Sequence, residues 1–190
     1  MKAWILNYID NNLNKEFNWF SVIFYFSVSG VYIFYLSKKM AFLDYEMELI
    51  PRIIGLLVLG LKNGIIINLS MSLLISLTGK FFKAKFRFKE TMKAMYIAFK
   101  PYLVAFLLII LDIIIVHFGE LNPNFEELIL VQIVKILIDL SIGAVGVLSI
   151  IILFSCLKRT QELTLGKTIL NYLVAGILNA PIYIWALGIW

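Results

Sequence analysis

The sequence predicts an all-α, polytopic integral membrane protein with five transmembrane helices. Two observations carry this prediction: 62% of the 190 residues are hydrophobic, and the apolar residues are gathered in five long segments. Soluble domains are only about 45–50% apolar, and a water-soluble chain of this size could not bury so many apolar side chains in one core. We therefore expect a single membrane domain over residues 1–190.

Each apolar segment reaches the roughly 17–25 residues that a helix needs to cross the hydrocarbon layer. The expected spans, which together form a five-helix bundle over residues 17–190, are 17–36, 53–77, 96–118, 128–157 and 168–190. The first span is too long for a cleavable signal peptide, and no small-residue cleavage site follows it. Before it, apolar residues recur at helical spacing from Ile5 to Leu13. They predict a short interfacial helix over residues 1–16, with a frayed tail as the open alternative.

Charge gives the expected orientation. Seven cations stand against one acid between Gly79 and Pro101, and cytoplasmic loops carry the excess of Lys and Arg. Residues 119–127 carry three acids and no cation, whereas residues 158–167 carry three cations and one acid. Alternation then predicts a cytoplasmic N-terminus and an external C-terminus. Abundant Ile, Phe, Lys and Asn with few Ala favour an AT-rich bacterial genome, so the expected location is the bacterial cytoplasmic membrane.

Ionisable residues also lie inside the expected spans. Each such group costs about 2.5–3.5 kcal/mol by insertion scales, which favours pairing or a functional role. At about 1.5 Å of rise per residue, all of them fall in the outer half of the bilayer. We expect Lys62 to pair with Asp112 across two helices, and Lys135 to pair with Asp139 one turn away. This intramembrane polar cluster either lines a cavity or fixes helix packing, with long Lys chains reaching outward as a further structural alternative.

The connection between the second and third spans alternates aromatic and cationic side chains. Its rings could anchor in the headgroup layer while its cations meet anionic lipid phosphates, or the cations could serve topology alone. Because proline disfavours a straight helix, residues 90–100 are expected to lie on the membrane surface before the chain turns inward. The residues of this lipid- or partner-binding loop are Lys83, Lys85, Phe86, Arg87, Phe88, Lys89, Tyr96 and Pro101.

Small residues mark the expected helix contacts. Glycines allow two helices to approach closely, and they can also support self-association into a homo-oligomer. Packing within the chain is the favoured use of the two pairs. They are Gly60 with Gly64 in the second span, and Gly143 with Gly146 in the fourth.

No catalytic motif is recognisable in the sequence. One Cys and one His allow neither an intrachain disulfide nor a histidine metal cluster, and no phosphate-binding loop occurs. A carboxylate pair of Asp112 and Asp139 would be neutralised by the neighbouring lysines. We expect no enzyme activity and no cofactor. The net charge of +5 is concentrated in membrane-flanking loops, so the expected partner surface is an anionic lipid bilayer and not nucleic acid.

Two stretches of the sequence carry a family resemblance. The run Leu-Thr-Gly-Lys-Phe-Phe-Lys-Ala-Lys-Phe-Arg-Phe-Lys over 77–89, then Met-Tyr-Ile-Ala-Phe-Lys-Pro-Tyr-Leu over 95–103, resembles the Yip domain family. This family comprises five-span membrane proteins first known as interactors of Rab-type GTPases. Tyr96, Ala98 and Pro101 resemble its Tyr-Ala/Ser-x-x-Pro motif.

The resemblance implies a non-enzymatic adaptor or accessory to a membrane partner, such as an export-type ATP-binding-cassette (ABC) transporter or trafficking machinery. A different class of function remains open from the residues themselves. It is a small substrate-binding or channel-forming transporter component that uses the polar cluster of the outer half of the membrane.

Overall fold

The computed structural model describes residues 2–43, 48–122, 124 and 128–187. This part of the chain is helical, with one 3-10 turn and no strand. The helices are α1 (Lys2–Leu13), α2 (Trp19–Leu43), α3 (Leu49–Thr78), α4 (Phe88–Phe99), α5 (Tyr102–Leu121), α7 (Ile129–Gln161) and α8 (Leu165–Leu187), and the 3-10 turn η1 covers Gly79–Phe82.

Five of the helices, namely α2, α3, α5, α7 and α8, are long and apolar enough to cross a membrane. The prediction of an all-α membrane protein with five spans is confirmed at this level, whereas the orientation of the termini stays a prediction. Residues 188–190, including the predicted end of the last span at Trp190, lie outside the described residues. The same holds for Glu126 and Glu127 of the expected acidic loop.

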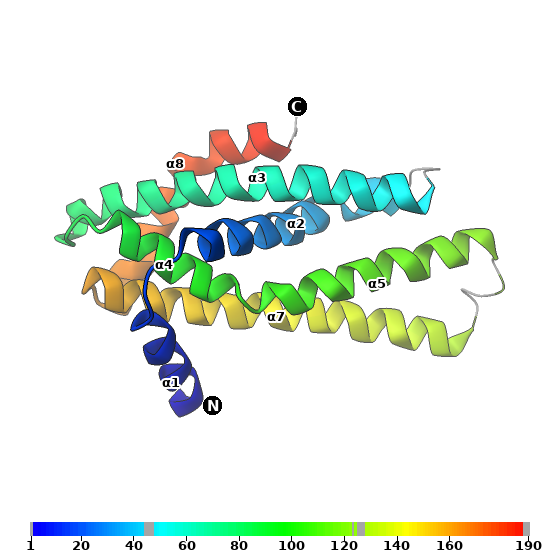
Figure 1. Cartoon of the computed structure of the whole chain (residues 1–190), viewed down its shortest axis with the longest axis horizontal. Helices are drawn as coiled ribbons and strands as arrows, with labels where there is room; N and C mark the ends of the chain where they lie inside the picture. The colour runs from blue at the N-terminus through cyan, green and yellow to red at the C-terminus, as the bar shows by residue number, and fades with distance from the viewer. Residues whose placement is uncertain (1, 44–47, 123, 125–127, 188–190) are drawn as a thin grey trace.

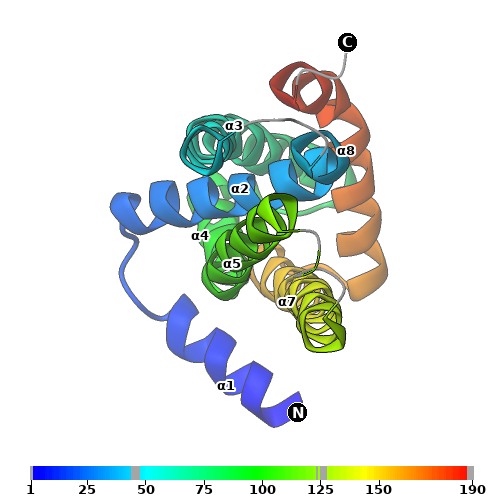
Figure 2. The ribbon, with the colours of Figure 1, turned by 90° about the vertical axis from the view of Figure 1, so that its right-hand side faces the viewer.

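Of the long helices, α3, α5 and α7 run along the longest axis of the molecule (Figure 1), whereas α2 and α8 are inclined to it (Figure 2). In that view α3 lies above α2, α5 lies below α2, and α7 lies lowest. Helix α1 is set apart near the end of the bundle where α7 ends and α8 begins, and it contacts α4 and α7. The expected N-terminal helix of residues 1–16 is therefore present over Lys2–Leu13.

The third predicted span is two helices and not one. Helix α4 ends at Phe99, and α5 begins at Tyr102 after Lys100 and Pro101, so the chain bends at the proline as it passes along α7 (Figure 1). Thr91, Met92 and 94–99 are buried against neighbouring helices, whereas Glu90 is exposed, and the position of residues 90–100 at the membrane surface stays a prediction. Helix α4 is amphipathic: its apolar face packs against α2, α3 and α7, and Lys89 and Glu90 lie on its exposed side.

The closest helix contact joins α2 to α3 through three glycines. A Cβ added at Gly64 would lie 2.6 Å from the Gly30 Cα, and one added at Gly30 would lie 2.5 Å from the Gly64 nitrogen. A Cβ added at Gly60 would meet the Val31 Cα at 2.7 Å. Gly60 and Gly64 therefore serve packing within the chain, against a glycine of α2 that the sequence pattern did not single out.

The two glycines of the second predicted pair have different surroundings. A Cβ added at Gly146 of α7 would collide with the hydroxyl oxygen of Tyr32 and would lie 3.3 Å from the Cζ atom of the same ring. No atom of the described residues lies within 4 Å of a Cβ built on Gly143. The prediction that Gly143 serves helix packing is therefore wrong for the described part of the chain, since this face of α7 points away from the bundle.

Candidate functional site

A cavity of about 400 Å³ lies among the spanning helices. It exists because α8 begins beside the end of α7 and then follows α3, so that α7 and α8 diverge (Figure 2). Residues from α2, α3, α4 and α5 close its inner side. The residues of α7 and α8 that line it are Ser149, Ile150, Leu153, Tyr172, Gly176, Asn179, Ala180 and Tyr183.

Buried asparagines hold α8 against α3. The Asn171 amide donates to the Ile75 carbonyl oxygen at 3.0 Å and to the Gln161 side-chain oxygen at 2.9 Å, and its own oxygen accepts from Thr78 at 2.6 Å. Two turns later, Asn179 accepts from Ser70 at 2.7 Å. Amide groups need such partners in an apolar surrounding. These contacts fix the path of α8, and therefore the width of the cavity.

Hydroxyl groups are the polar groups of the cavity wall that a ligand could hydrogen-bond. Ser149 is 1% exposed, and its Oγ meets no described residue in hydrogen-bond geometry, although the Tyr102 phenol lies close to it. Tyr172 also lines the cavity from α8. Each hydroxyl can donate one hydrogen bond and accept others, so a ligand that offers an acceptor oxygen beside Ser149 and Tyr102 would gain more than it would from an apolar wall.

Among the described residues that line the cavity, none has a charged side chain. Asn68 is already engaged, since its amide donates to Ser29 at 2.6 Å and to the Gly64 carbonyl oxygen at 2.8 Å. Ile150 of α7 lines the cavity and is half-exposed. The cavity therefore opens on the outer surface of the helix bundle beside this residue. The arrangement suits the apolar body of an uncharged molecule with one or two polar oxygens.

The predicted intramembrane polar cluster forms only in part, and it lies outside this cavity. Asp112 is 1% exposed on α5 and accepts a hydrogen bond from the buried Tyr35 phenol of α2. Asp139 of α7 lies within electrostatic reach of the same phenol. Lys135 is half-buried one turn before Asp139. The two acids therefore lie near one phenol, with Asp112 buried and Asp139 exposed.

Lys62 does not join them, so the predicted pairing of Lys62 with Asp112 is wrong. The buried face of this part of α3 is formed by Gly60, Asn63 and Gly64, and Lys62 is exposed. The exposed position agrees with the alternative of a long Lys side chain that reaches outward along the helix surface.

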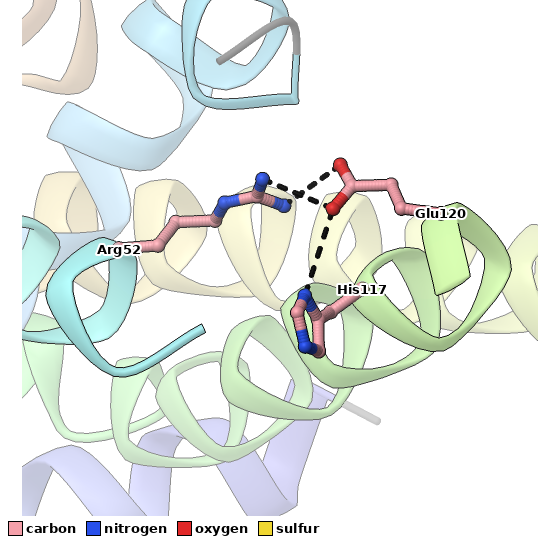
Figure 3. A network of polar contacts seen from close by, with 3 residues as sticks. All are labelled: Arg52, His117 and Glu120. Atoms are coloured by element: carbon pink, nitrogen blue, oxygen red, sulfur yellow. Dashed lines mark hydrogen bonds and ion pairs between the residues drawn. The ribbon is translucent and has the colours of Figure 1, made fainter. Parts of the chain in front are cut away.

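A second ionic network joins α3 to α5 (Figure 3). The Arg52 guanidinium is 0% exposed and donates to both carboxylate oxygens of Glu120, at 3.0 and 3.1 Å. The His117 Nδ1 lies 3.6 Å from the Glu120 Oε2. Two-pronged Arg–carboxylate pairs are the strongest and most directional of protein ion pairs. This network ties the start of α3 to the end of α5.

Arg52 and Glu120 lie just outside the expected spans 53–77 and 96–118, in the connecting segments. Their pairing depends on two segments 68 residues apart, so no local spacing could reveal it. A usable signal was present, however, because Arg52 and Glu120 both border expected spans on the same predicted side of the membrane. Opposite charges at one depth are candidates for pairing.

The predicted basic-aromatic loop is partly folded into the bundle. Arg87 donates to Glu162 at 2.7 Å and to the Thr160 carbonyl oxygen at 3.3 Å, which ties the start of α4 to the end of α7. Tyr96 is only 4% exposed, Phe88 packs against the core, and Pro101 stands between α4 and α5. The residues of this loop that remain exposed are Lys83, Lys85, Phe86 and Lys89.

Cations of α4 and its end also hold α1. Lys93 donates to the Leu13 carbonyl oxygen at 2.6 Å and to that of Lys15, and Lys100 donates to the Asn12 side-chain oxygen at 2.5 Å. Desolvation by burial lowers the pKa of both lysines. The ammonium groups therefore serve as donors that cap the end of α1.

No group of three or more His, Cys, Asp and Glu side chains that could hold a metal ion occurs in the described ranges of the chain. Comparison of the chain with models of known protein families, with curated proteins and with solved structures finds no match. The candidate site is therefore defined by its own geometry: five helices that can span a membrane, and an uncharged cavity between the two that diverge.

Proposed function

We propose that this chain is a non-catalytic, multi-pass membrane protein that binds an uncharged amphipathic molecule between α7 and α8. The observation that carries the proposal is the cavity with the Ser149 and Tyr102 hydroxyls on its otherwise apolar inner wall. A volume of about 400 Å³ lies within the usual range of small-molecule sites. The proposal keeps the substrate-binding alternative of the sequence analysis and moves its site from the charged cluster to this cavity.

The chemistry of the wall supports binding without catalysis. Its polar side chains are hydroxyls and amides, and it contains no carboxylate, imidazole or amine that could serve as a general base. The ligand class is a long-chain or ring-bearing molecule with a hydroxyl, carbonyl or ether oxygen. Its oxygen would lie near Ser149 and Tyr102, and its apolar part would extend past Gly176.

Filling the cavity tests the proposal. Gly176 has room for a Cβ, whose nearest neighbour would be the Met71 Cε at 3.8 Å, so a Gly176→Leu side chain would project into the cavity. Gly143→Leu is the matched control because nothing lies within 4 Å of its Cβ. The assay is retention of deuterated hexadecanol through size-exclusion chromatography, quantified by mass spectrometry.

Wild type and Gly143→Leu are expected to retain the alcohol in a saturable, one-to-one amount, and Gly176→Leu to lose it while remaining folded. Equal retention by all three proteins would show that the alcohol partitions into the detergent or onto the outer surface. The same outcome with solvent-extracted native lipids would reject the cavity as the binding site.

The adaptor role remains a second candidate, and one observation favours it. Lys83, Lys85 and Lys89 stay exposed at the end of the bundle that carries α1 and α4. With this end in the cytosol, as the positive-inside rule favours, the cationic surface could meet a membrane-protein partner such as an ABC transporter. The resemblance to the Yip domain family supports the same role.

A photo-reactive amino acid at Lys85 tests this second candidate in cells, with the same probe at Gly143 as the outward-facing control. A single membrane-protein adduct that forms only from position 85 would support the adaptor role. Equal labelling of lipids or of many proteins from both positions would contradict it.

A further inference from the structure

A separate cavity, of about 510 Å³, lies where α1, the end of α7 and the start of α8 meet. Its walls come from three helices: Ile5 and Leu6 from α1, Ile151 and Ser155 from α7, and Leu165 from α8. Two cations, Lys158 and Arg159, line it from the last turn of α7. It shares no residue with the cavity between α7 and α8.

One face of α7 changes from apolar to cationic along this cavity. Ile151, Ser155 and Lys158 follow at intervals of four and three residues, so they lie on the same side of the helix. The distance from Ile151 to Lys158 is about 10 Å at 1.5 Å per residue. Ile151 and Leu165 are 42% and 50% exposed. Exposed apolar side chains beside two cations suit a molecule that is apolar at one end and anionic at the other.

We propose that this cavity binds one anionic phospholipid, with its phosphate at Lys158 and Arg159 and part of an acyl chain against Ile151, Ile5 and Leu165. The apolar walls commit the site to a lipid and not to free phosphate, which would leave them exposed to water. A lipid is also the one phosphate-bearing molecule always present beside a chain with five membrane-spanning helices.

Asp10 of α1 contacts one of the two cations of this cavity. It forms an ion pair with Arg159 across the mouth of the cavity, and both side chains are partly exposed. A guanidinium has five N–H donors, so a phosphate can share Arg159 with this carboxylate. Lys158, which is exposed, supplies the second contact. The ion pair also holds α1 in place as the third wall.

The test uses the full-length protein in vesicles of phosphatidylcholine that contain a minor fraction of phosphatidylglycerol. After mild extraction, native mass spectrometry counts the phosphatidylglycerol molecules that each chain retains. The charge variant is Lys158→Gln with Arg159→Gln, and the matched control is Lys15→Gln with Lys80→Gln, two exposed lysines that do not line the cavity. Both variants remove two positive charges, and the control removes them from a surface outside the cavity.

Wild type and the control are expected to retain one phosphatidylglycerol, and the charge variant to bind it about tenfold more weakly. A third variant, Ile151→Trp, keeps both cations and fills the apolar wall, and it is expected to weaken retention as well. Circular dichroism confirms that each variant is folded.

Equal losses in the charge variant and the control would overturn the proposal, because net charge alone would then attract the lipid. Full retention by Ile151→Trp would also overturn it, since the acyl chain would not lie in the cavity. Displacement of the lipid by inorganic phosphate at equal concentration would show an anion site without a chain-binding part, which contradicts the lipid assignment. None of these outcomes affects the cavity between α7 and α8.

Discussion

The contact between α2 and α3 allows a quantitative test of the packing. We choose Gly30→Ala, which adds one methyl group to the buried face of α2. Its carbon would lie 2.5 Å from the Gly64 nitrogen and still closer to the Gly60 carbonyl oxygen. Ordinary carbon contacts lie at about 3.5–4.0 Å, so the helices would have to move apart by about 1 Å.

The free-energy cost follows from what the new methyl group meets. Overpacking a core costs about 1–3 kcal/mol when side chains can move aside. At Gly30 the neighbours are backbone atoms of Gly60 and Gly64, which cannot rotate away. We therefore expect Gly30→Ala to lower the free energy of unfolding by about 3 kcal/mol or more.

The assay is reversible unfolding in mixed micelles, followed by circular dichroism. Gly143→Ala is the control, since the methyl group there meets no atom within 4 Å, and its unfolding free energy should change by less than about 0.5 kcal/mol. An unchanged stability of Gly30→Ala would refute the close approach of α2 and α3. A second result that would refute it is an equal loss in both variants, which would point to helix propensity in place of packing.

Three further predictions concern the polar contacts. Glu120→Gln is expected to lower the unfolding free energy by about 2 kcal/mol, because it removes the carboxylate that accepts two charge-assisted hydrogen bonds from Arg52; the same change should cost much less in an Arg52→Met background, and an equal cost in both backgrounds would argue against a direct pair. Lys93→Gln should release α1, measured as faster protease cleavage near Leu13, and unchanged cleavage would show that its hydrogen bonds do not hold α1. Because burial lowers the pKa of Lys93 and Lys100 from 10.5, the folded chain binds fewer protons than the unfolded chain between the lowered pKa values and pH 10.5, so the contribution of these lysines to the free energy of unfolding should rise with pH across that window; a fall in the wild type relative to a Lys93→Gln, Lys100→Gln variant would contradict this.

Hydropathy was enough to predict the five spans, because transfer into lipid depends on the composition of a segment and not on its neighbours. The Gly60 and Gly64 pair was predictable for a similar reason. A glycine lacks a side chain whatever its neighbours are, and in membrane helices glycines commonly let two helix backbones approach closely. The partner, Gly30 on α2, needed the structure.

The wrong predictions have one cause: each depends on contacts between segments that are distant in the sequence. The third span was expected to begin at Tyr96, but the chain bends at Pro101, so Tyr96 belongs to α4 and the spanning helix α5 begins at Tyr102. Lys62 was assigned to a cluster by depth alone, whereas the direction in which a helix face points decides whether a side chain meets a partner. Depth along a helix can be counted from the sequence, but rotation about its axis depends on all the packed neighbours.

The candidate cavity could not be predicted for the same reason. It results from the divergence of α7 and α8, which in turn depends on where Asn171 and Asn179 bond to α3. The sequence contains both asparagines inside an expected span. A rule that treats buried amides as helix-docking points would have paired α8 with α3.

An electron-microscopy map of the protein in lipid nanodiscs tests the central claim most directly. We expect α7 and α8 to diverge as here, with elongated non-protein density between Ser149 and Gly176 that disappears in Gly176→Leu. If α7 and α8 pack along their whole length, or if the space holds no density in the wild type and matches that of the variant, the proposed binding site does not exist.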